Sequence, residues 1–330
     1  MRVAVVGAGS WGTAVALLAD ASGLDTRLVC RTQEQADRIR ATRSNPHYLP
    51  AVTVPPSIVP VALDDPRCLD GVDLVALALP SRRIRDAAPM IVAHLPASAG
   101  VLSLTKGLDP TNGDRLSQTW RDLLPAGTPL CVLSGPNHAE EIAVRQPAAA
   151  VVAGDRSLAR AIQEHLSGPR FRLYVNDDLV GVELCGAAKN VIAIAAGMSD
   201  GVGFGDNCKA TLITRGLAEM TRLGVACGAS EATFRGLAGM GDLVATCTSR
   251  HSRNRRAGEM IARGTGADMI EGDIGQVAEG LWTVARLRAL AEARGVELPI
   301  SAEVAAIAFG GRPVLASLEA LMTRAPAVEE

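Results

Sequence analysis

The chain has 330 residues, with 33 lysines and arginines against 35 aspartates and glutamates, and a formal net charge of −2. That length suggests about two domains, each able to bury a hydrophobic core. A hydrophobic fraction of 48% and a charged fraction of 21% argue against a disordered chain. The balanced charge argues against a nucleic-acid-binding surface spread over the whole molecule, although it leaves room for a local basic pocket.

The seven cysteines include no C-x-x-C pair, and their number is odd. This spacing fits neither a disulfide framework nor a zinc site, so we expect a reducing, cytoplasmic environment and no metal. The lone pair Cys247 and His251 is better explained as incidental than as metal-binding. No apolar run approaches the ~18–20 residues that cross a membrane, and Gly7 interrupts the apolar N-terminus too early for a signal peptide.

Short apolar runs alternate with helix-like stretches through the first half of the chain. This rhythm is typical of βαβ units and a largely parallel sheet. The runs that we predict as buried strands cover residues 3–6, 27–30, 58–61, 74–79, 101–104, 130–133, 149–152 and 171–175.

The pattern becomes helical after Asn176. Asp177 and Asp178 are good N-cap residues for a long helix over residues 179–198, and no alternating strand pattern follows it. We therefore expect an α/β fold: a Rossmann-type, doubly wound, mostly parallel sheet in residues 1–177, then an all-helical domain in residues 178–330 with a frayed tail at 325–330. The further predicted helices cover residues 209–223, 231–237, 255–263, 277–293, 301–309 and 313–323.

A glycine-rich turn follows the first predicted strand, where Gly7, Gly9 and Gly12 form the pattern G-x-G-x-x-G. The first glycine allows a tight turn, the second lets the backbone approach a pyrophosphate, and the third lets the next helix pack closely. The helix N-terminus then attracts the phosphate charge. The motif predicts a dinucleotide cofactor. A P-loop is excluded, because none of the three lysines is preceded by glycine.

The end of the second predicted strand bears on the choice between NAD and NADP. An acidic residue there would bind the adenosine ribose and repel a 2′-phosphate, whereas this chain has Arg31 and Thr32. Arg31 suits a charge-assisted fork to a 2′-phosphate, with the Thr32 hydroxyl beside it. The alternative is an ordinary surface arginine. We favour NADP as the cofactor, with NAD as the second choice.

Only three of the basic residues are lysines, so each raises the question of why arginine does not serve there. Lys106 follows a predicted strand, at the carboxyl edge of the sheet where open α/β folds bind ligands. Lys189 lies in an apolar helix, and a desolvated lysine can release a proton near neutral pH as arginine cannot. The alternative is that its ammonium group reaches solvent. We interpret Lys209, at the start of a helix, as structural.

Four arginines occur within residues 250–256, with no acidic residue among them, around the start of a predicted helix. A helix N-terminus with arginine and hydroxyl donors suits one phosphate monoester, although a solvated basic turn would have the same sequence. Asp242 follows glycines at 239 and 241, which predicts a turn that presents its carboxylate to local positive charge.

Together these motifs resemble those of the bacterial NAD(P)-dependent sn-glycerol-3-phosphate dehydrogenases. The resemblance runs over nearly the whole chain in the family's order. It implies the reduction of dihydroxyacetone phosphate to sn-glycerol 3-phosphate, which supplies phospholipid synthesis. The matching stretches are GAGSWGTA at 7–14, YLP at 48–50, TKG at 105–107, SGPNHAEE at 134–141, the segments 182–207 and 210–220, GMGDL at 239–243, SRHSRNRRAG at 249–258 and VAEG at 277–280.

The resemblance also implies roles for single residues. Lys189 matches the family's proton donor and acceptor, and Asn137 stands where many members have serine. The residues at substrate-binding positions are Lys106, Gly135, Asn137, Lys189, Asp242, Ser252, Arg253 and Asn254. Those at cofactor-binding positions, together with the motif glycines Gly7, Gly9 and Gly12, are Ser10, Trp11, Arg31, Thr32, Tyr48, Lys106, Ala139, Arg253, Val277 and Glu279.

Two alternatives stay open at this point. A dehydrogenase of the β-hydroxy acid or ketopantoate type would also use a helix lysine, but it needs a carboxylate site in place of the basic segment 250–256. A non-catalytic NADP-sensing module would not require a complete set of proton-transfer and phosphate-binding residues. As partners we expect a small triose phosphate substrate and a second copy in a homodimer, with no nucleic acid and no membrane insertion.

Overall fold

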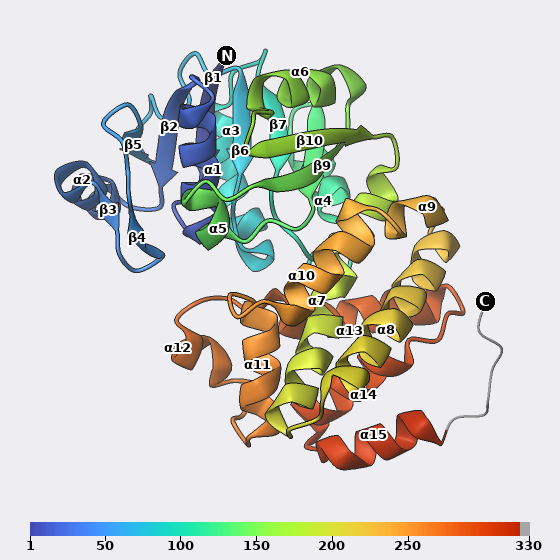
Figure 1. Ribbon diagram of the computed structural model, residues 1–330. Coiled ribbons are helices and arrows are strands. Elements are labelled where there is room, and N and C mark those ends of the chain that lie inside the picture. The colour runs from blue at the N-terminus through green and yellow to red at the C-terminus, as the bar shows by residue number, and fades with distance from the viewer. Residues whose placement is uncertain (324–330) are drawn as a thin grey trace.

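One eight-stranded sheet organises the N-terminal part of the chain in the computed structural model, which describes residues 1–323 (Figure 1). The strand order is β10-β9-β8-β7-β6-β1-β2-β5, and the ladders are parallel apart from the antiparallel pair β8 and β9. The strands are β1 (Arg2–Val6), β2 (Asp25–Cys30), β5 (Val59–Ala62), β6 (Leu74–Leu77), β7 (Gly100–Ser103), β8 (Leu130–Ser134), β9 (Ala148–Gly154) and β10 (Phe171–Asn176).

Helices cover both faces of this sheet, which confirms the doubly wound architecture. Side chains of β1 alternate between the faces, so that Val3 and Val5 join one hydrophobic cluster and Ala4 and Val6 join another. The first cluster includes residues of α1 (Ser10–Ala21), α2 (Gln33–Thr42), α5 (Ala139–Ala143) and α6 (Arg156–Leu166). The second includes residues of α3 (Ile84–His94) and α4 (Leu116–Leu123).

All eight predicted strands are present, and their ends differ from the prediction by at most two residues. The small antiparallel hairpin of β3 (Ser44–Asn45) and β4 (Leu49–Thr53) was not predicted. Its strands are short and three of the five residues of β4 are exposed, so they lack the apolar run that marks the buried strands.

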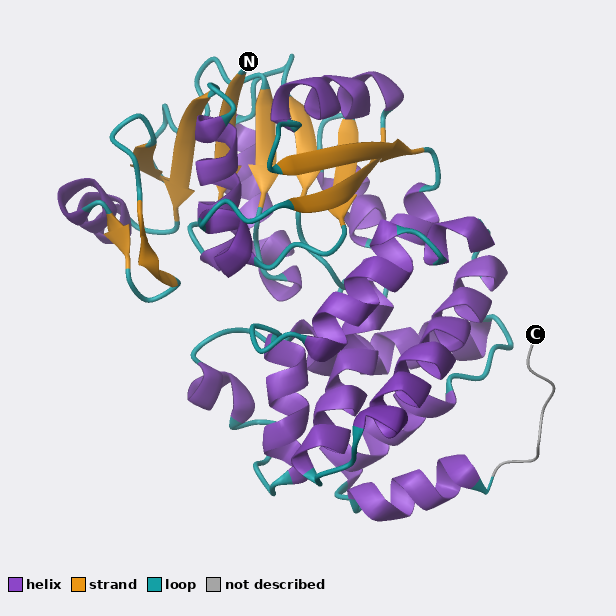
Figure 2. Cartoon of the chain, viewed as in Figure 1, coloured by secondary structure: helices purple, strands orange, loops and turns teal. Residues whose placement is uncertain are grey.

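The chain from residue 179 to the end of the described part forms helices without a strand, as predicted (Figure 2). The expected tail at 325–330 lies outside the described residues. The helices are α7 (Leu179–Gly201), α8 (Asp206–Ala226), α9 (Glu231–Phe234), α10 (Asp242–Thr248), α11 (Arg253–Ala262), α12 (Ile270–Ile274), α13 (Glu279–Ala293), α14 (Pro299–Gly310) and α15 (Val314–Met322).

Helix α7 is the core of this helical region. By length and composition alone it would be able to cross a membrane, with a mean hydropathy of 1.6, but 78% of that stretch is buried inside the protein. Asp178 caps its N-terminus by accepting a hydrogen bond from Gly181 N at 2.8 Å, as predicted. Helix α11 packs so closely on α7 that a Cβ on Gly258 would overlap Ile194 O. The short distance between α7 and α11 therefore requires glycine at this contact.

Two helices of this region, α10 and α12, were not predicted. The expected glycine-permitted turn at residues 239–242 is wrong. A π-helical turn, Leu237–Gly241, leads directly into α10. Asp242 is the first residue of α10, and its φ of −72° is helical. Gly239 serves close packing there, because a Cβ would overlap Phe234 O.

The carboxyl ends of the central parallel strands point toward the helical region, as their arrowheads show (Figure 2). In open α/β sheets this is the edge at which ligands bind. Side chains of both regions meet at this edge, where Lys106 after β7 binds Asp242 of α10.

Candidate active site

Lys189 lies in the middle of α7, and only 5% of its surface is exposed. Its Nζ donates to Asp242 Oδ1 and, at 2.7 Å, to Thr246 Oγ1. Both partners belong to α10 and stand one turn apart, so one face of that short helix presents them to the ammonium group. The alternative in which this group reaches solvent is wrong.

Lys106 approaches the same carboxylate from the sheet. It follows β7, and its Nζ donates to Asp242 Oδ2 at 2.7 Å, to Gly135 O at 3.0 Å and to Asn137 Oδ1 at 3.1 Å. The loop after β8 supplies the last two acceptors, and Gly135 has a φ of +142° that other residues rarely adopt. The structure thus brings together the two lysines, Asp242 and the loop residues that the sequence predicted for the substrate site.

The charges of this cluster shift one another's titration. Burial lowers the pKa of Lys189 from its usual 10.5 to about 7; Asp242 opposes this shift, and the charge of Lys106 adds to it. Burial disfavours the charged form of Asp242, but Lys106 and Lys189 outweigh it and hold the pKa of this carboxyl below its usual value. Asp242 therefore stays ionised while Lys189 titrates near neutral pH.

The glycine-rich turn between β1 and α1 has the shape of a phosphate cradle. Gly7 has a φ of +109°, and a Cβ on Gly12 would overlap Gly7 O, so neither position accepts a larger residue. Around Gly9, by contrast, no heavy atom lies within 4 Å of the place of a Cβ. The first turn of α1 has no acidic residue and no side-chain cap, and the buried Nε1 of Trp11 has no hydrogen-bond partner among residues 1–323. These features fit the pyrophosphate of a dinucleotide.

Other expected cofactor residues surround this cradle. Ser10 Oγ lies 3.0 Å from Tyr48 O in the β3–β4 hairpin and 3.3 Å from Gln276 Oε1 in the segment before α13. Val277 is partly buried in that same segment, and Ala139 begins α5 with 8% of its surface exposed.

Arg31 and Thr32 follow β2 but differ in the contacts that their side chains make. Arg31 is exposed, and its guanidinium forms no ion pair within residues 1–323. Thr32 Oγ1 accepts a hydrogen bond from Gln35 N at 3.3 Å and so caps α2. One lone pair of its oxygen therefore serves the helix, and its proton is left for an acceptor on a ligand.

Glu279 joins the helical region to the sheet. Its carboxylate accepts hydrogen bonds from Ser81 N at 3.0 Å and Ser81 Oγ at 2.6 Å, in the 3₁₀ turn η1 (Ser81–Arg83) that follows β6. Burial raises the pKa of Glu279, while Ser81 and the nearby Arg253 counter that rise. The expected cofactor residue Glu279 thus lies within electrostatic range of the expected substrate residue Arg253.

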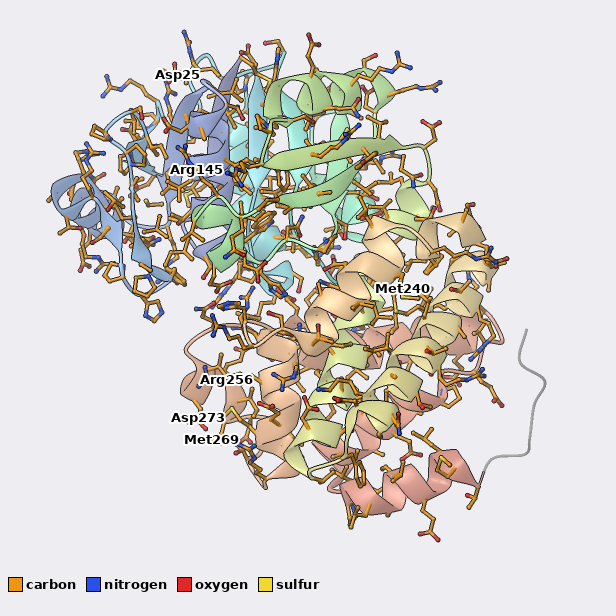
Figure 3. All side chains as sticks on the ribbon, viewed as in Figure 1. Asp25, Arg145, Met240, Arg256, Met269 and Asp273 are labelled. Carbon is orange, nitrogen blue, oxygen red and sulfur yellow. The ribbon has the colours of Figure 1, made fainter. Side chains whose placement is uncertain are left out.

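The basic segment 250–256 divides into two groups, which corrects the simple expectation of a four-arginine cradle. Arg255 is engaged within the fold, with its Nε 2.7 Å from Asp200 and its Nη2 2.8 Å from Glu259. Lys209 also binds Asp200, at 2.7 Å, which accords with its structural interpretation. The exposed arginines of the segment are Arg250, Arg253 and Arg256. Figure 3 labels Arg256, which lies on α11.

The side chains of Ser252 and Asn254 support Arg253 from both sides. Ser252 Oγ accepts from Arg255 N at 3.2 Å and caps α11. Asn254 Nδ2 donates to Asn190 Oδ1 on α7 at 2.9 Å, and its Oδ1 accepts from Gly280 N on α13 at 2.9 Å. Their polar atoms therefore hold the N-terminus of α11 in place, with Arg253 as its first residue.

Two residues of this site were missed by sequence reasoning. Thr246 stands four positions after Asp242, a spacing that would have identified it had α10 been predicted. Ser81 follows β6 at the ligand edge of the sheet, but nothing in its sequence context marks it. Within residues 1–323, no group of three or more His, Cys, Asp and Glu side chains is arranged to hold a metal ion.

Two family models for NAD-dependent glycerol-3-phosphate dehydrogenase match the chain, the N-terminal model over residues 2–159 and the C-terminal model over residues 178–319. The chain belongs to this family. It is therefore an oxidoreductase that uses a nicotinamide cofactor, and the family match favours the predicted activity over the ketopantoate-type alternative and the non-catalytic module.

Curated relatives from this family align over 98% or more of the chain. The NAD(P)+ glycerol-3-phosphate dehydrogenase of Thermus thermophilus is 48% identical over 331 residues, covering 100% of both chains. That of Desulfitobacterium hafniense is 43% identical, covering 98% of this chain and 91% of the relative. The crystal structure of the Coxiella burnetii glycerol-3-phosphate dehydrogenase superposes with a TM-score of 0.93 at 37% identity, over 98% of this chain and 99% of that one.

The open space above Gly9 gives a prediction for cofactor binding. Gly9→Ala keeps the fold, because Gly9 has an ordinary φ of −83° and free space around it. The new methyl group occupies the approach to the helix N-terminus, so the cofactor Kd rises about tenfold or more. Isothermal titration with NADPH measures the Kd. Gly12→Ala is the matched comparison, and it should lower the urea midpoint because its Cβ overlaps Gly7 O. An unchanged Kd for Gly9→Ala would place the pyrophosphate elsewhere.

Proposed function

We propose that the protein reduces dihydroxyacetone phosphate to sn-glycerol 3-phosphate with NADPH, with Lys189 as proton donor and acceptor, and that the product feeds glycerophospholipid synthesis. The observation that carries this proposal is the buried Asp242 carboxylate shared by Lys106 and Lys189. A titratable ammonium group beside an ionised carboxylate suits proton exchange with a carbonyl oxygen. Membership of the glycerol-3-phosphate dehydrogenase family supports the substrate.

A bound nicotinamide supplies the hydride that reaches C2 of the substrate. As negative charge grows on the C2 oxygen, protonated Lys189 stabilises that charge and then delivers its proton. In the direction of oxidation, neutral Lys189 removes the proton from the hydroxyl group. Lys106 adds positive potential and favours release of the proton from Lys189, while Asp242 keeps both side chains directed at the reacting oxygen.

Asn137 is proposed to bind the substrate through its amide nitrogen. Its Oδ1 is held by Lys106, but its buried Nδ2 has no hydrogen-bond partner among the described residues. A buried donor without a partner costs about 1–3 kcal/mol, so a substrate oxygen there would remove an existing penalty. The amide also retains the donor function of the serine that is common in the family.

The substrate phosphate is proposed to lie at the N-terminus of α11, against Arg253. A helix N-terminus and a guanidinium group both favour a phosphate dianion, and binding there would orient the ketone toward the proton donor. In this arrangement Gly135 shapes the pocket wall, and Ser252 and Asn254 act on the substrate by holding Arg253.

The remaining expectations follow from the same assignment. Residues 1–177 are the dinucleotide-binding domain, from which Lys106, Gly135 and Asn137 also reach the substrate, and residues 178–330 are the substrate-binding domain with the proton donor. The exposed Arg31, with the Thr32 proton beside it, supports a preference for NADP. The seven free cysteines support a cytoplasmic location. We expect a homodimer, which sedimentation would test.

The substrate proposal is tested by following nicotinamide absorbance with dihydroxyacetone phosphate and, separately, with ketopantoate as a carboxylate substrate. We expect turnover on the phosphate alone. Arg253→Ala should raise the KM for dihydroxyacetone phosphate about tenfold or more, because a charge-assisted contact to the phosphate is lost. An unchanged KM would place the phosphate elsewhere, and turnover on ketopantoate alone would overturn the substrate class.

The role of Lys189 predicts opposite pH profiles for the two directions. Reduction requires the protonated amine, so kcat/KM for reduction falls as the pH rises through about 7. Oxidation requires the neutral amine, so kcat/KM for oxidation rises over the same interval. Lys189→Arg keeps the charge but cannot release the proton, and we expect kcat to fall by about 10²–10⁴ with the cofactor Kd unchanged. Near wild-type turnover would show that another group transfers the proton.

The cofactor preference is tested at Arg31. Arg31→Ala should raise the KM for NADPH about tenfold, because the guanidinium no longer pairs with the 2′-phosphate, and should leave the KM for NADH unchanged. Arg38→Ala, at an exposed position of α2, is the matched control and should change neither value. Equal effects on both cofactors would mean that Arg31 does not read the 2′-phosphate.

A further inference from the structure

His138 lies between the loop that binds Lys106 and helix α10, which binds Lys189. It has no part in the proton transfer described above. It follows the loop that carries Gly135 and Asn137, and it forms the N-cap of α5. Its ring is partly buried, and its Nε2 lies 3.2 Å from Ala245 O of α10. Ala245 immediately precedes Thr246, so this contact reaches the helix that holds Lys189.

The partner of this contact determines the protonation of the ring. A carbonyl oxygen only accepts hydrogen bonds, so Nε2 carries a proton. Burial lowers the pKa of His138, and the charge of Lys189 adds to this effect, while Ala245 O, Asp242 and Glu141 oppose it. The net shift favours the neutral ring, with its proton on Nε2 and Nδ1 bare. The ring of His251 stands opposite, with 6.2 Å between centroids.

The contact closes a ring of interactions around the site. The loop after β8 binds Lys106 Nζ through Gly135 O and Asn137 Oδ1, and at the next residue, His138, the chain binds α10. Pro136 of the same loop lies against the start of α10, since a Cβ on Gly241 would be 3.7 Å from Pro136 Cγ. Asp242 completes the ring by binding both lysines.

We propose that His138 is a positioning residue, whose Nε2–H fixes α10 relative to the Lys106 loop and so holds Asp242 and Thr246 on Lys189. Helix α10 has only seven residues and begins directly after a π-helical turn. Its buried Leu243 and Cys247 pack it on the core, and His138 adds the polar contact that joins it to the Lys106 loop. The proposal rests on the function proposed for Lys189.

Two substitutions separate the hydrogen bond from the volume of the ring. His138→Phe keeps an aromatic ring but loses the donor, whereas His138→Gln keeps an NH donor at nearly the reach of Nε2. We expect kcat for reduction to fall about tenfold in His138→Phe and less than about twofold in His138→Gln, with the KM for NADPH unchanged in both. An unchanged kcat in His138→Phe, or equal losses in the two variants, would overturn the proposal.

The pH profile distinguishes positioning from a general loss of structure. When α10 is no longer held, Asp242 supports the ammonium form of Lys189 less well, so the pKa of Lys189 falls. The descending limb for reduction should therefore move to lower pH by about 0.5 unit or more in His138→Phe and stay in place in His138→Gln. His165→Phe, at an exposed position of α6, is the control and should leave rate and profile unchanged. A limb that stays in place in His138→Phe would contradict the proposal.

A measurement on the wild-type protein keeps the proposal testable if His138→Phe does not fold. Long-range ¹H–¹⁵N spectra at neutral pH should show the His138 ring neutral and protonated at Nε2. A ring protonated at Nδ1 alone would overturn the contact itself. This result does not depend on the identity of the proton donor. Turnover by Lys189→Arg would refute the role of Lys189, whereas the tautomer of His138 tests only the hydrogen bond from His138 to Ala245 O.

Discussion

The site depends on one buried carboxylate that serves two ammonium groups. Asp242 is 2% exposed, and each of its oxygens binds a different lysine. Removing such charges from water costs several kcal/mol per ion, and replacing a buried pair with apolar side chains often stabilises a protein. The cluster is therefore poorly explained by stability. The catalytic role that we propose would explain it, because one negative charge between two positive ones leaves a net positive field at the site proposed for the oxyanion.

The fold keeps these three charges together by fixing the elements that carry them. Helix α7 is anchored at its N-terminus, where Glu183 accepts hydrogen bonds from Ser117 N at 2.7 Å and Arg115 Nη1 at 2.6 Å in the sheet region. Asp178 caps the same end and also binds Ser230 N at 2.9 Å. The Glu183 contacts attach the long buried helix to the start of α4 in the N-terminal region, and the Asp178 contact attaches it to the start of α9. The position of the ammonium group relative to Lys106 is thus set by rigid elements, which suits a site that must hold reacting atoms in place.

Local sequence signals were sufficient for the sheet, for the glycine-rich turn and for singling out two lysines that the fold brings onto one carboxylate. Most of the strands are short apolar runs bounded by glycine, proline, asparagine or a charged residue, and an isolated lysine in an apolar helix is visible without a structure. What could not be predicted depends on packing between distant elements. Asp242 was expected on a loop because Gly239 and Gly241 look like turn residues, yet Gly239 is there to let the backbone approach Phe234. Because of that error α10 was not predicted, and so Thr246 was not identified.

In the arginine segment 250–256, too, an ion pair depends on a residue that is distant in the sequence. Sequence alone presented four equivalent cations near one helix start, but Asp200, 55 positions before Arg255, takes up one of them. Which arginine remains for a phosphate is decided by the acidic residues that the fold brings near, and no local pattern reports them. The resemblance had already selected Arg253, and the ion pairs of Arg255 remove that neighbour from consideration while Arg250 and Arg256 stay exposed.

The balance between Asp242 and Lys106 explains why lysine, and not arginine, suits position 189. Burial alone would push the ammonium group toward the neutral form, and Asp242 alone would hold its proton too firmly for transfer. Lys106 weakens the pull of Asp242, and the three effects together bring the pKa of Lys189 to about 7. A general acid and base works best when its pKa lies near the working pH. An arginine would form the same ion pair with Asp242 but would not respond to this balance, because its pKa lies too far above neutrality to be brought within reach.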